Sequence, residues 1–177
     1  MAEKEVIFFT GGARSGKSAA AQLEAEGLEG QLVYLATAEV RDDEMADRVK
    51  KHQLVRGARW STLEEPLDLA GALRSIGEDK GGVLVDCLTL WTSNLLERHH
   101  GDVDSILAMV DEFISELQKR RLNVVVVTNE TGSGIVPIEP LARSFRDLAG
   151  TINQRVAAVA DRAYLVVSGL PLRLGKS

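Results

Sequence analysis

The chain has very little cysteine, and this limits both its covalent chemistry and its environment. Its 177 residues include one cysteine, Cys87, and three histidines. A single cysteine cannot form an internal disulfide, and no Cys/His cluster has the spacing of a zinc site. A chain of this length can bury an ordinary hydrophobic core without such a cross-link. We therefore expect one catalytic domain over residues 1–177, in a reducing compartment such as the cytoplasm.

Long apolar segments and an excess of positive charge are also absent. The first ten residues, MAEKEVIFFT, contain an apolar run too brief for a signal sequence or a membrane span, so we expect neither export nor membrane insertion. The 26 acidic residues outnumber the 21 Lys and Arg residues, for a formal net charge of -5. This balance argues against a nucleic-acid-binding surface, whereas a small anionic ligand needs only a local cluster of donors.

Short runs rich in β-branched residues recur along the chain, separated by segments with helical periodicity. These runs cover residues 6–10, 32–36, 83–87, 123–128 and 163–167. They are continuous and not alternating, so both faces of each strand should be covered. The pattern predicts an α/β fold with a mostly parallel sheet flanked by helices. The segment 129–140, NETGSGIVPIEP, has two glycines and two prolines and is predicted to be a loop.

Two stretches show the three- and four-residue spacing of amphipathic helices. One follows Asp102, which suits an N-cap, and its apolar stripe consists of Ile106, Val110, Phe113 and Leu117. The other contains Gly150, and its stripe consists of Phe145, Leu148, Ile152, Val156 and Val159. A further helix is predicted to end at His99 and His100, with Gly101 as its stop signal.

The segment 11–18, GGARSGKS, matches the phosphate-binding pattern G-x-x-x-x-G-K-[ST]. A predicted buried strand precedes it and a helix-compatible segment, AAAQLEAE, follows it, whereas a simple glycine-rich turn would not require this setting. In such a P-loop, backbone N–H groups converge on phosphate oxygens and the helix dipole favours anionic charge. Lys17 would neutralise the β- and γ-phosphates. We therefore predict a soluble enzyme that binds a nucleoside triphosphate on this loop.

Two residues are candidate ligands for the Mg²⁺ that accompanies a nucleoside triphosphate. Ser18 occupies the P-loop position whose hydroxyl binds the metal. Asp86 ends the apolar run VLVD, where P-loop enzymes usually carry a second, metal-orienting acid. The alternative for Asp86 is a cap at the protein surface, although a carboxylate that closes an apolar run is seldom there for packing.

The segment 42–59, DDEMADRVKKHQLVRGAR, begins with acids suited to a helix N-terminus and becomes basic afterwards. In a helix, Arg48, His52 and Arg56 would lie four residues apart on one face. They would form either a solvated, charged surface, which the residues alone favour, or a site in which His52 attacks the α-phosphate of a nucleotide. The spacing by itself does not decide between the two.

Several segments together resemble one family closely. They are GGARSGKS, LVYLATAE, DDEMADRVKKH, VLVDCLTLWTSNLL, TNETGSGIVP and LARSFRDLAGTINQRVAAVADRAYLVVSGLPL. In this order, over nearly the whole chain, they are similar to the bifunctional adenosylcobinamide kinase/adenosylcobinamide-phosphate guanylyltransferase of cobalamin biosynthesis. A P-loop is shared with many NTPases, whereas the TNE loop and the FRDLAG-x-x-NQR segment are far more specific. The resemblance implies a three-layer P-loop NTPase fold of the RecA-like type.

The resemblance also implies two reactions: phosphorylation of adenosylcobinamide by ATP or GTP, and transfer of GMP from GTP to that phosphate through a guanylylated histidine. His52 matches that histidine, with Arg56 and Trp60 at the family spacing, and Lys17 is the second catalytic residue. The implied nucleotide contacts are Gly12, Ala13, Arg14, Ser15, Gly16, Lys17, Ser18, Ala38, Glu39, Val40, Gln53, Leu54, Val55, Arg56, Glu64 and Asp86. Mg²⁺, small-molecule substrates and a homotrimer with sites near the subunit boundaries are implied as well.

The chain departs from the family pattern at a few positions. Gly57 stands where a proline usually follows the arginine, and Thr131 and Ser133 replace apolar residues of the TNE loop. None of these changes removes a group that the chemistry needs. Two other functions stay open on the residues: a single-function P-loop kinase for another small molecule, and a non-catalytic GTP-binding switch. Such switches usually carry D-x-x-G and N-K-x-D motifs, which residues 86–89 and 128–131 do not match.

Overall fold

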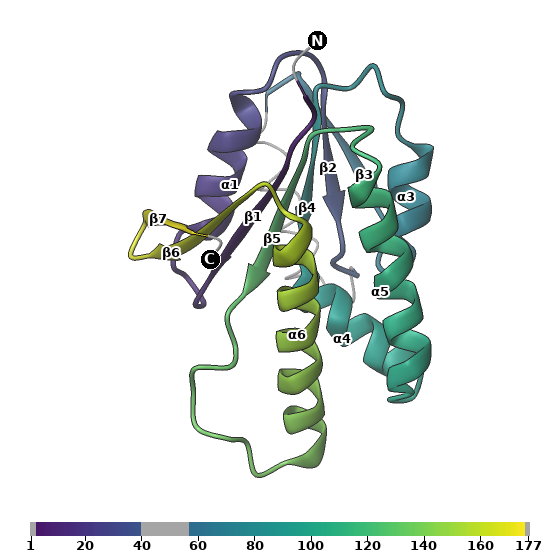
Figure 1. Cartoon of the computed structure of the whole chain (residues 1–177), viewed down its shortest axis with the longest axis vertical. Coiled ribbons are helices and arrows are strands. Elements are labelled where there is room, and N and C mark those ends of the chain that lie inside the picture. The colour runs from purple at the N-terminus through teal and green to yellow at the C-terminus, as the bar shows by residue number, and fades with distance from the viewer. Residues whose placement is uncertain (1–2, 40–56, 176–177) are drawn as a thin grey trace.

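The computed structural model describes residues 3–39 and 57–175, in which helices cover both faces of a seven-stranded sheet (Figure 1). The strands are β1 (Val6–Gly11), β2 (Leu32–Ala36), β3 (Trp60–Glu64), β4 (Gly82–Asp86), β5 (Val124–Asn129), β6 (Arg162–Val167) and β7 (Leu170–Leu174). The helices are α1 (Lys17–Glu26), α3 (Leu69–Ser75), α4 (Leu88–Arg98), α5 (Val103–Gln118) and α6 (Pro140–Val159). None of the described helices has the length and apolar character needed to cross a bilayer.

The strands lie in the order β3-β2-β4-β5-β1-β6-β7, and every neighbouring pair is parallel except β6 and β7. Alternation along β1 assigns its side chains to two cores. Val6 and Phe8 pack with residues of α3, α4, α5 and α6, whereas Ile7 and Phe9 pack with Ala21 of α1. The prediction of strands covered on both faces is confirmed for β1, β2, β4 and β5, whereas β6 is only partly buried. The three-layer α/β architecture is confirmed as well.

Each of the predicted strands is present with bounds within one residue of the expected ones, whereas β3 and β7 were not predicted. Both are edge strands. In β3, Trp60 and Leu63 are half-buried and the other residues are exposed, so it lacks the apolar run of a central strand. All of β7 is exposed, and Pro171 is tolerated there because β7 pairs only with β6.

The predicted helix ends are confirmed by local hydrogen bonds and backbone angles. The Asp102 carboxylate accepts hydrogen bonds from the Ser105 hydroxyl (2.6 Å) and the Ser105 backbone N–H (3.4 Å), and these bonds lower the pKa of Asp102. At the end of α4, His100 and Gly101 have φ of 50° and 79°, which stops the helix as expected. The predicted loop 129–140 ends where Pro140 begins α6, a position that proline favours.

Trp91 of α4 is the largest fully buried side chain, and its loss should destabilise the fold strongly. It is 1% exposed, packs edge-on against Phe113 of α5 and donates from Nε1 to the Leu67 carbonyl at 2.7 Å. We expect Trp91→Ala to lower the free energy of unfolding by about 3–5 kcal/mol, measured by urea denaturation. The neighbouring Leu90, which is 38% exposed, is the control, since Leu90→Ala should cost less than about 1 kcal/mol. Equal effects of the two substitutions would contradict this account of the core.

Candidate nucleotide-binding site

The P-loop connects the buried strand β1 to α1, as the sequence pattern requires. Arg14 and Gly16 have positive φ, 57° and 92°, and this backbone conformation turns successive N–H groups toward one side of the loop. Lys17 begins α1 and is 8% exposed, and its Nζ donates to the Gly12 carbonyl at 3.2 Å. The Ser15 N–H donates to the same carbonyl at 3.2 Å. The loop thus places an ammonium group and a helix N-terminus together, the donor set that binds phosphate.

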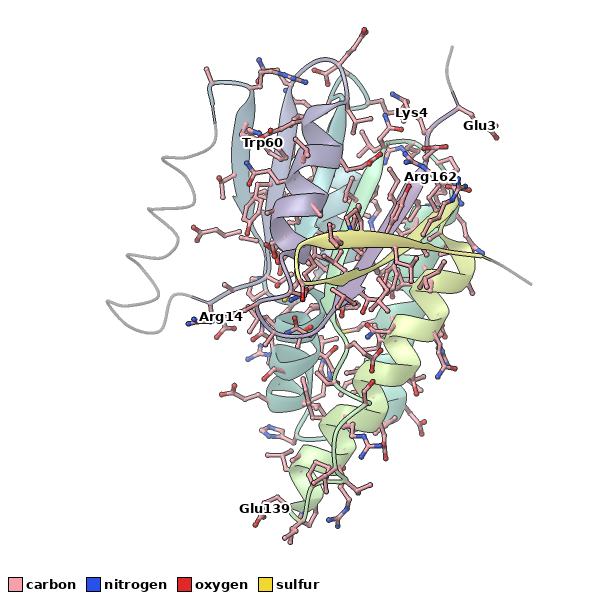
Figure 2. All side chains as sticks on the ribbon, turned by 90° about the vertical axis from the view of Figure 1, so that its left-hand side faces the viewer. Glu3, Lys4, Arg14, Trp60, Glu139 and Arg162 are labelled. Carbon is pink, nitrogen blue, oxygen red and sulfur yellow. The ribbon has the colours of Figure 1, made fainter. Side chains whose placement is uncertain are left out.

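The hairpin formed by β6 and β7 supports this loop, and the sequence did not indicate that role. Figure 2 shows the hairpin crossing the molecule beside the loop near Arg14. The Gly169 N–H in the hairpin turn donates to the Ser15 carbonyl at 2.7 Å. A Cβ on Gly16 would lie 3.0 Å from the Gly169 Cα, and a Cβ on Gly11 would lie 2.5 Å from the Val166 carbonyl oxygen. Both P-loop glycines are therefore required by close packing against the hairpin, and Gly16 is required by its positive φ as well.

This support predicts that Gly169→Ala weakens nucleotide binding. Gly169 has a φ of 83° with open space around its Cβ position, so alanine would strain the backbone by about 1–2 kcal/mol without a clash. We expect a several-fold rise in the Kd for GTP, measured by calorimetry, because the strain acts on the bond to Ser15. Gly101 is the matched control: its φ is 79°, its Cβ position is also open, and it follows α4. Equal loss of GTP affinity in Gly101→Ala would show that general destabilisation, and not the hairpin contact, is the cause.

The register of the sheet brings several of the predicted nucleotide-binding residues to one edge. Ala36, at the end of β2, pairs with Glu64 at the end of β3 and with Asp86 at the end of β4. Strand β5 separates β4 from β1, and its last residue, Asn129, pairs with Gly11 of the P-loop. These are the carboxyl ends of parallel strands, the edge at which α/β proteins bind their ligands.

Asp86 and Glu64 lie on the same face of the sheet as α1. Leu84 and Trp60 pack in the core beneath α1, and side chains an even number of residues further along the same strands share that face. The Tyr34 hydroxyl, also from this side, donates to the Asp86 carboxylate at 3.0 Å. Asp86 is half-buried and Glu64 is exposed. The carboxylate predicted to orient a metal therefore lies on the P-loop side of the sheet and is itself held by a tyrosine that the sequence analysis missed.

The turn after β2, which contains the predicted contacts Ala38 and Glu39, is fixed by buried hydrogen bonds. The Thr37 hydroxyl accepts from the Cys87 N–H and donates to the Cys87 carbonyl, both at 2.8 Å. Asn94 of α4 donates to the Thr37 carbonyl at 2.8 Å. Glu39 lines a cavity of about 360 Å³ whose other lining residues are Leu67, Asn94, Glu97, Arg98 and His100. Thr37 was not predicted to be a site residue. The sequence signal that could have identified it is its position as a polar residue directly after the apolar strand β2.

The Cys87 thiol is buried where β4 meets α4. Burial, and then the neighbouring charge of Asp86, raises the pKa of the Cys87 thiol. The thiol therefore stays protonated at neutral pH, and a protonated thiol is a poor nucleophile. In residues 3–39 and 57–175, no group of three His, Cys, Asp or Glu side chains is placed to hold a metal ion.

Arg59, the last residue of the basic segment 42–59, has a structural role. Arg59 donates to the carbonyls of Gly30 (3.0 Å), Glu26 (3.3 Å) and Leu28, so it closes the C-terminal end of α1 and the turn after it. The remaining predictions lie outside the described residues. They are Val40, Arg48, His52, Gln53, Leu54, Val55 and Arg56.

Comparison with known proteins agrees with this geometry. Residues 7–174 match the family described as cobinamide kinase / cobinamide phosphate guanyltransferase. The chain belongs to this family. It is 43% identical over 169 residues to the bifunctional adenosylcobalamin biosynthesis protein CobP of Pseudomonas aeruginosa, covering 93% of this chain and 94% of that protein. It is 39% identical over 180 residues to its counterpart CobU of Escherichia coli, covering 96% and 99%.

The fold has a broader relative among solved structures. The RadB recombinase superposes with a TM-score of 0.52 at 15% identity, covering 93% of this chain and 74% of that one. At this identity the likeness concerns the fold alone, and it agrees with the P-loop NTPase architecture of the RecA-like type. The family assignment rests instead on the matches that span almost the full length of the cobinamide kinase / cobinamide phosphate guanyltransferase relatives.

Proposed function

We propose that this protein phosphorylates the free hydroxyl of adenosylcobinamide with a nucleoside triphosphate and then transfers GMP from GTP to the new phosphate, giving adenosylcobinamide-GDP. The observation that carries the proposal is the family match over residues 7–174, together with a correctly formed P-loop in that chain. The two reactions share a substrate class, since each acts on a phosphate of a nucleoside triphosphate. A single P-loop site at the carboxyl edge of the sheet suits both.

We propose that the phosphoryl transfer is carried out by residues of the P-loop. The backbone N–H groups of residues 12–18 hold the phosphates, and the buried Lys17 places its charge beside the β- and γ-phosphates. The corrinoid hydroxyl oxygen forms a bond to the γ-phosphorus and releases its proton to solvent, while the bond to the β–γ bridging oxygen breaks and the nucleoside diphosphate leaves. Lys17 stabilises charge that develops on the transferred group.

Mg²⁺ fits the donor set at this site. The metal would take ligands from a few side chains and from the nucleotide. That is the usual arrangement for Mg²⁺ in nucleotide sites. Ser18, in the first turn of α1, and Asp86, on the same face of the sheet, would supply the oxygen ligands. The metal would neutralise phosphate charge.

His52 is the proposed acceptor in the guanylyl transfer. Its imidazole nitrogen forms a P–N bond to the α-phosphorus of GTP, the bond to the α–β bridging oxygen breaks, and pyrophosphate leaves. A phosphate oxygen of the corrinoid then attacks the same phosphorus, the P–N bond breaks, and the histidine is restored. Gln53, Leu54, Val55, Arg56 and the described Glu64 are proposed to contact the nucleotide during this step.

The proposal extends to assembly and location. We propose a homotrimer with nucleotide sites near the subunit boundaries, acting in the cytoplasm with ATP or GTP as phosphate donor. Exposed apolar side chains at Ile135, Val136 and Ile138, which are 97%, 59% and 90% exposed, offer surface for a subunit contact. Sedimentation analysis of the purified protein would test the trimer.

Growth complementation tests the two activities together. A bacterial strain that lacks its own enzyme for these steps, and that depends on added cobinamide for cobalamin, should grow when this chain is expressed. A single-function kinase for another small molecule, or a GTP-binding switch, would leave cobinamide unchanged and would not restore growth. Failure to restore growth, with the protein present and folded, would contradict the proposal.

A further inference from the structure

Strand β5 occupies a special position in the sheet. It lies directly between β1, which carries the P-loop, and β4, which carries Asp86. Its last residue, Asn129, is opposite Gly11, and the next residue, Glu130, donates its N–H to the Gly11 carbonyl at 3.0 Å. The end of β5 is thus tied to the start of the P-loop on one side and lies beside the Asp86 strand on the other.

The side chain of Asn129 belongs to the P-loop face of the sheet. Val125 and Val127 pack in the core beneath α1, and Asn129 is the next residue of that alternating series. Its neighbour Thr128 belongs to the opposite face, where it contacts Asn153 of α6. The amide of Asn129 therefore lies on the same face as Asp86, with the P-loop on its other side, and it is half-buried.

A network of hydrogen bonds from two helices fixes the backbone of Asn129. The Thr89 hydroxyl of α4 accepts from the Asn129 N–H at 2.7 Å, and Asn153 Nδ2 donates to the Asn129 carbonyl at 3.1 Å. Thr128 joins the two partners, since its hydroxyl donates to Asn153 Oδ1 at 2.8 Å and lies 3.3 Å from the Thr89 hydroxyl. Both backbone polar groups of Asn129 are held by side chains, and within the described part of the chain no hydrogen bond involves its own amide side chain. These bonds hold the backbone of Asn129 at the end of β5 and do not use its amide side chain.

We propose that the Asn129 amide binds the terminal phosphate of the nucleoside triphosphate, and that Asn153 and Thr89 are positioning residues for it. The P-loop N–H groups hold the α- and β-phosphates, so the terminal phosphate extends over the carboxyl ends of the neighbouring strands, and the first of these is β5. A neutral amide donates a hydrogen bond to a phosphate oxygen without adding charge beside Lys17. A carboxylate such as that of Asp86 would instead repel the phosphate anion.

Affinity for triphosphate compared with diphosphate tests the assignment directly. Calorimetry would measure the binding of a non-hydrolysable GTP analogue and of GDP to the full-length protein. In Asn129→Ala we expect affinity for the analogue to fall about 10- to 100-fold, the size of a lost hydrogen bond to a charged group, with GDP affinity unchanged. Equal affinity losses for both nucleotides, or none, would overturn the assignment.

Asn123, which directly precedes β5, is the matched control. It has a structural role, because its side chain accepts from the Glu5 N–H at 3.0 Å and donates to the Gly81 carbonyl at 2.9 Å. Asn123→Ala should lower the thermal unfolding temperature but leave the ratio of triphosphate to diphosphate affinity as in the unmodified protein. A change in that ratio as large as the one in Asn129→Ala would mean that strand stability, and not the amide, sets it.

The positioning role of Asn153 has its own test. Asn153→Ala should reduce the ratio of triphosphate to diphosphate affinity several-fold, whereas Thr151→Ala on the same helix, which removes only a bond to the Asp147 carbonyl, should not. An unchanged ratio in Asn153→Ala would overturn the positioning role.

The inference rests on the proposed function only for the identity of the nucleotide, and the binding assay contains no corrinoid. Suppose that the unmodified protein converts cobinamide but Asn129→Ala leaves the ratio of triphosphate to diphosphate affinity unchanged. That pair of results would reject the inference and leave the proposed function standing. If instead Asn129→Ala reduces that ratio but the unmodified protein does not convert cobinamide, the proposed function is rejected and the inference stands.

Discussion

His52→Asn is expected to abolish guanylyl transfer and to leave cobinamide phosphorylation intact. Asparagine has similar size and polarity but is not a nucleophile toward phosphorus, so the P–N intermediate cannot form. Loss of a covalent nucleophile lowers kcat by about 10⁶-fold in well-studied enzymes. Incubation with α-labelled GTP should give the unmodified protein an acid-labile, base-stable label, as expected for a phosphoramidate, and should leave the variant unlabelled.

Another histidine provides a control for this experiment. His99 ends α4 and does not line the cavity that contains Glu39, as His100 does, so His99→Asn should leave both labelling and phosphorylation unchanged. Label that survives in His52→Asn would remove the guanylyltransferase half of the proposed function. Label that is lost from both variants would point to a general effect of histidine loss on folding.

Lys17→Ala is expected to lower the rate of cobinamide phosphorylation by about 10²- to 10³-fold. The lysine is buried at the start of α1, where its ammonium group would stabilise the charge of the transferred phosphoryl group in the transition state. The effect should appear in kcat as well as in KM, because that interaction strengthens as charge develops. Steady-state kinetics with cobinamide and ATP or GTP would measure it.

Lys80 is the control for charge alone. It lies between α3 and β4 and forms a surface ion pair with Asp79 at 3.7 Å, so Lys80→Ala should leave the rate unchanged. A Lys17→Ala variant that keeps its rate within a few-fold of the unmodified protein, while remaining folded by circular dichroism, would contradict the role of the P-loop in phosphoryl transfer.

Local patterns in the sequence predicted the central part of this fold well. Continuous β-branched runs identify strands buried on both faces, and VVVV in β5 is the clearest example because helices cover it from both sides. The P-loop could be placed because strand, glycines and helix are contiguous. Strands β3 and β7 were missed because they lie at the edges of the sheet. Other elements cover less of an edge strand than of a central one, so its residues need not be apolar.

Contacts between distant segments could not be predicted from local patterns. The support of Ser15 by Gly169 joins residues far apart in the sequence, and neither residue type signals it. The same is true of Asn153 and Asn129, whose hydrogen bond depends on where α6 crosses the end of β5. Asp86 was found because it ends an apolar run, whereas Tyr34, which donates to it, stands inside one.

The role of His52 has a different basis from that of the P-loop. Physical reasoning from spacing left a charged surface and a nucleophile both open, and the family resemblance favoured the nucleophile. Residues 40–56 lie outside the part of the chain that the structure describes, so that role stays a prediction. The P-loop, in contrast, lies wholly within the described residues, and its hydrogen bonds are defined there.

Mass spectrometry of the corrinoid products tests the central claim most directly. The purified protein would be incubated with adenosylcobinamide, GTP and Mg²⁺, and the products separated and weighed. The proposed function predicts conversion first to a species that has gained one phosphate and then to the GDP-linked corrinoid. Unchanged adenosylcobinamide, or a phosphate gain that never proceeds to the GDP-linked product, would contradict it.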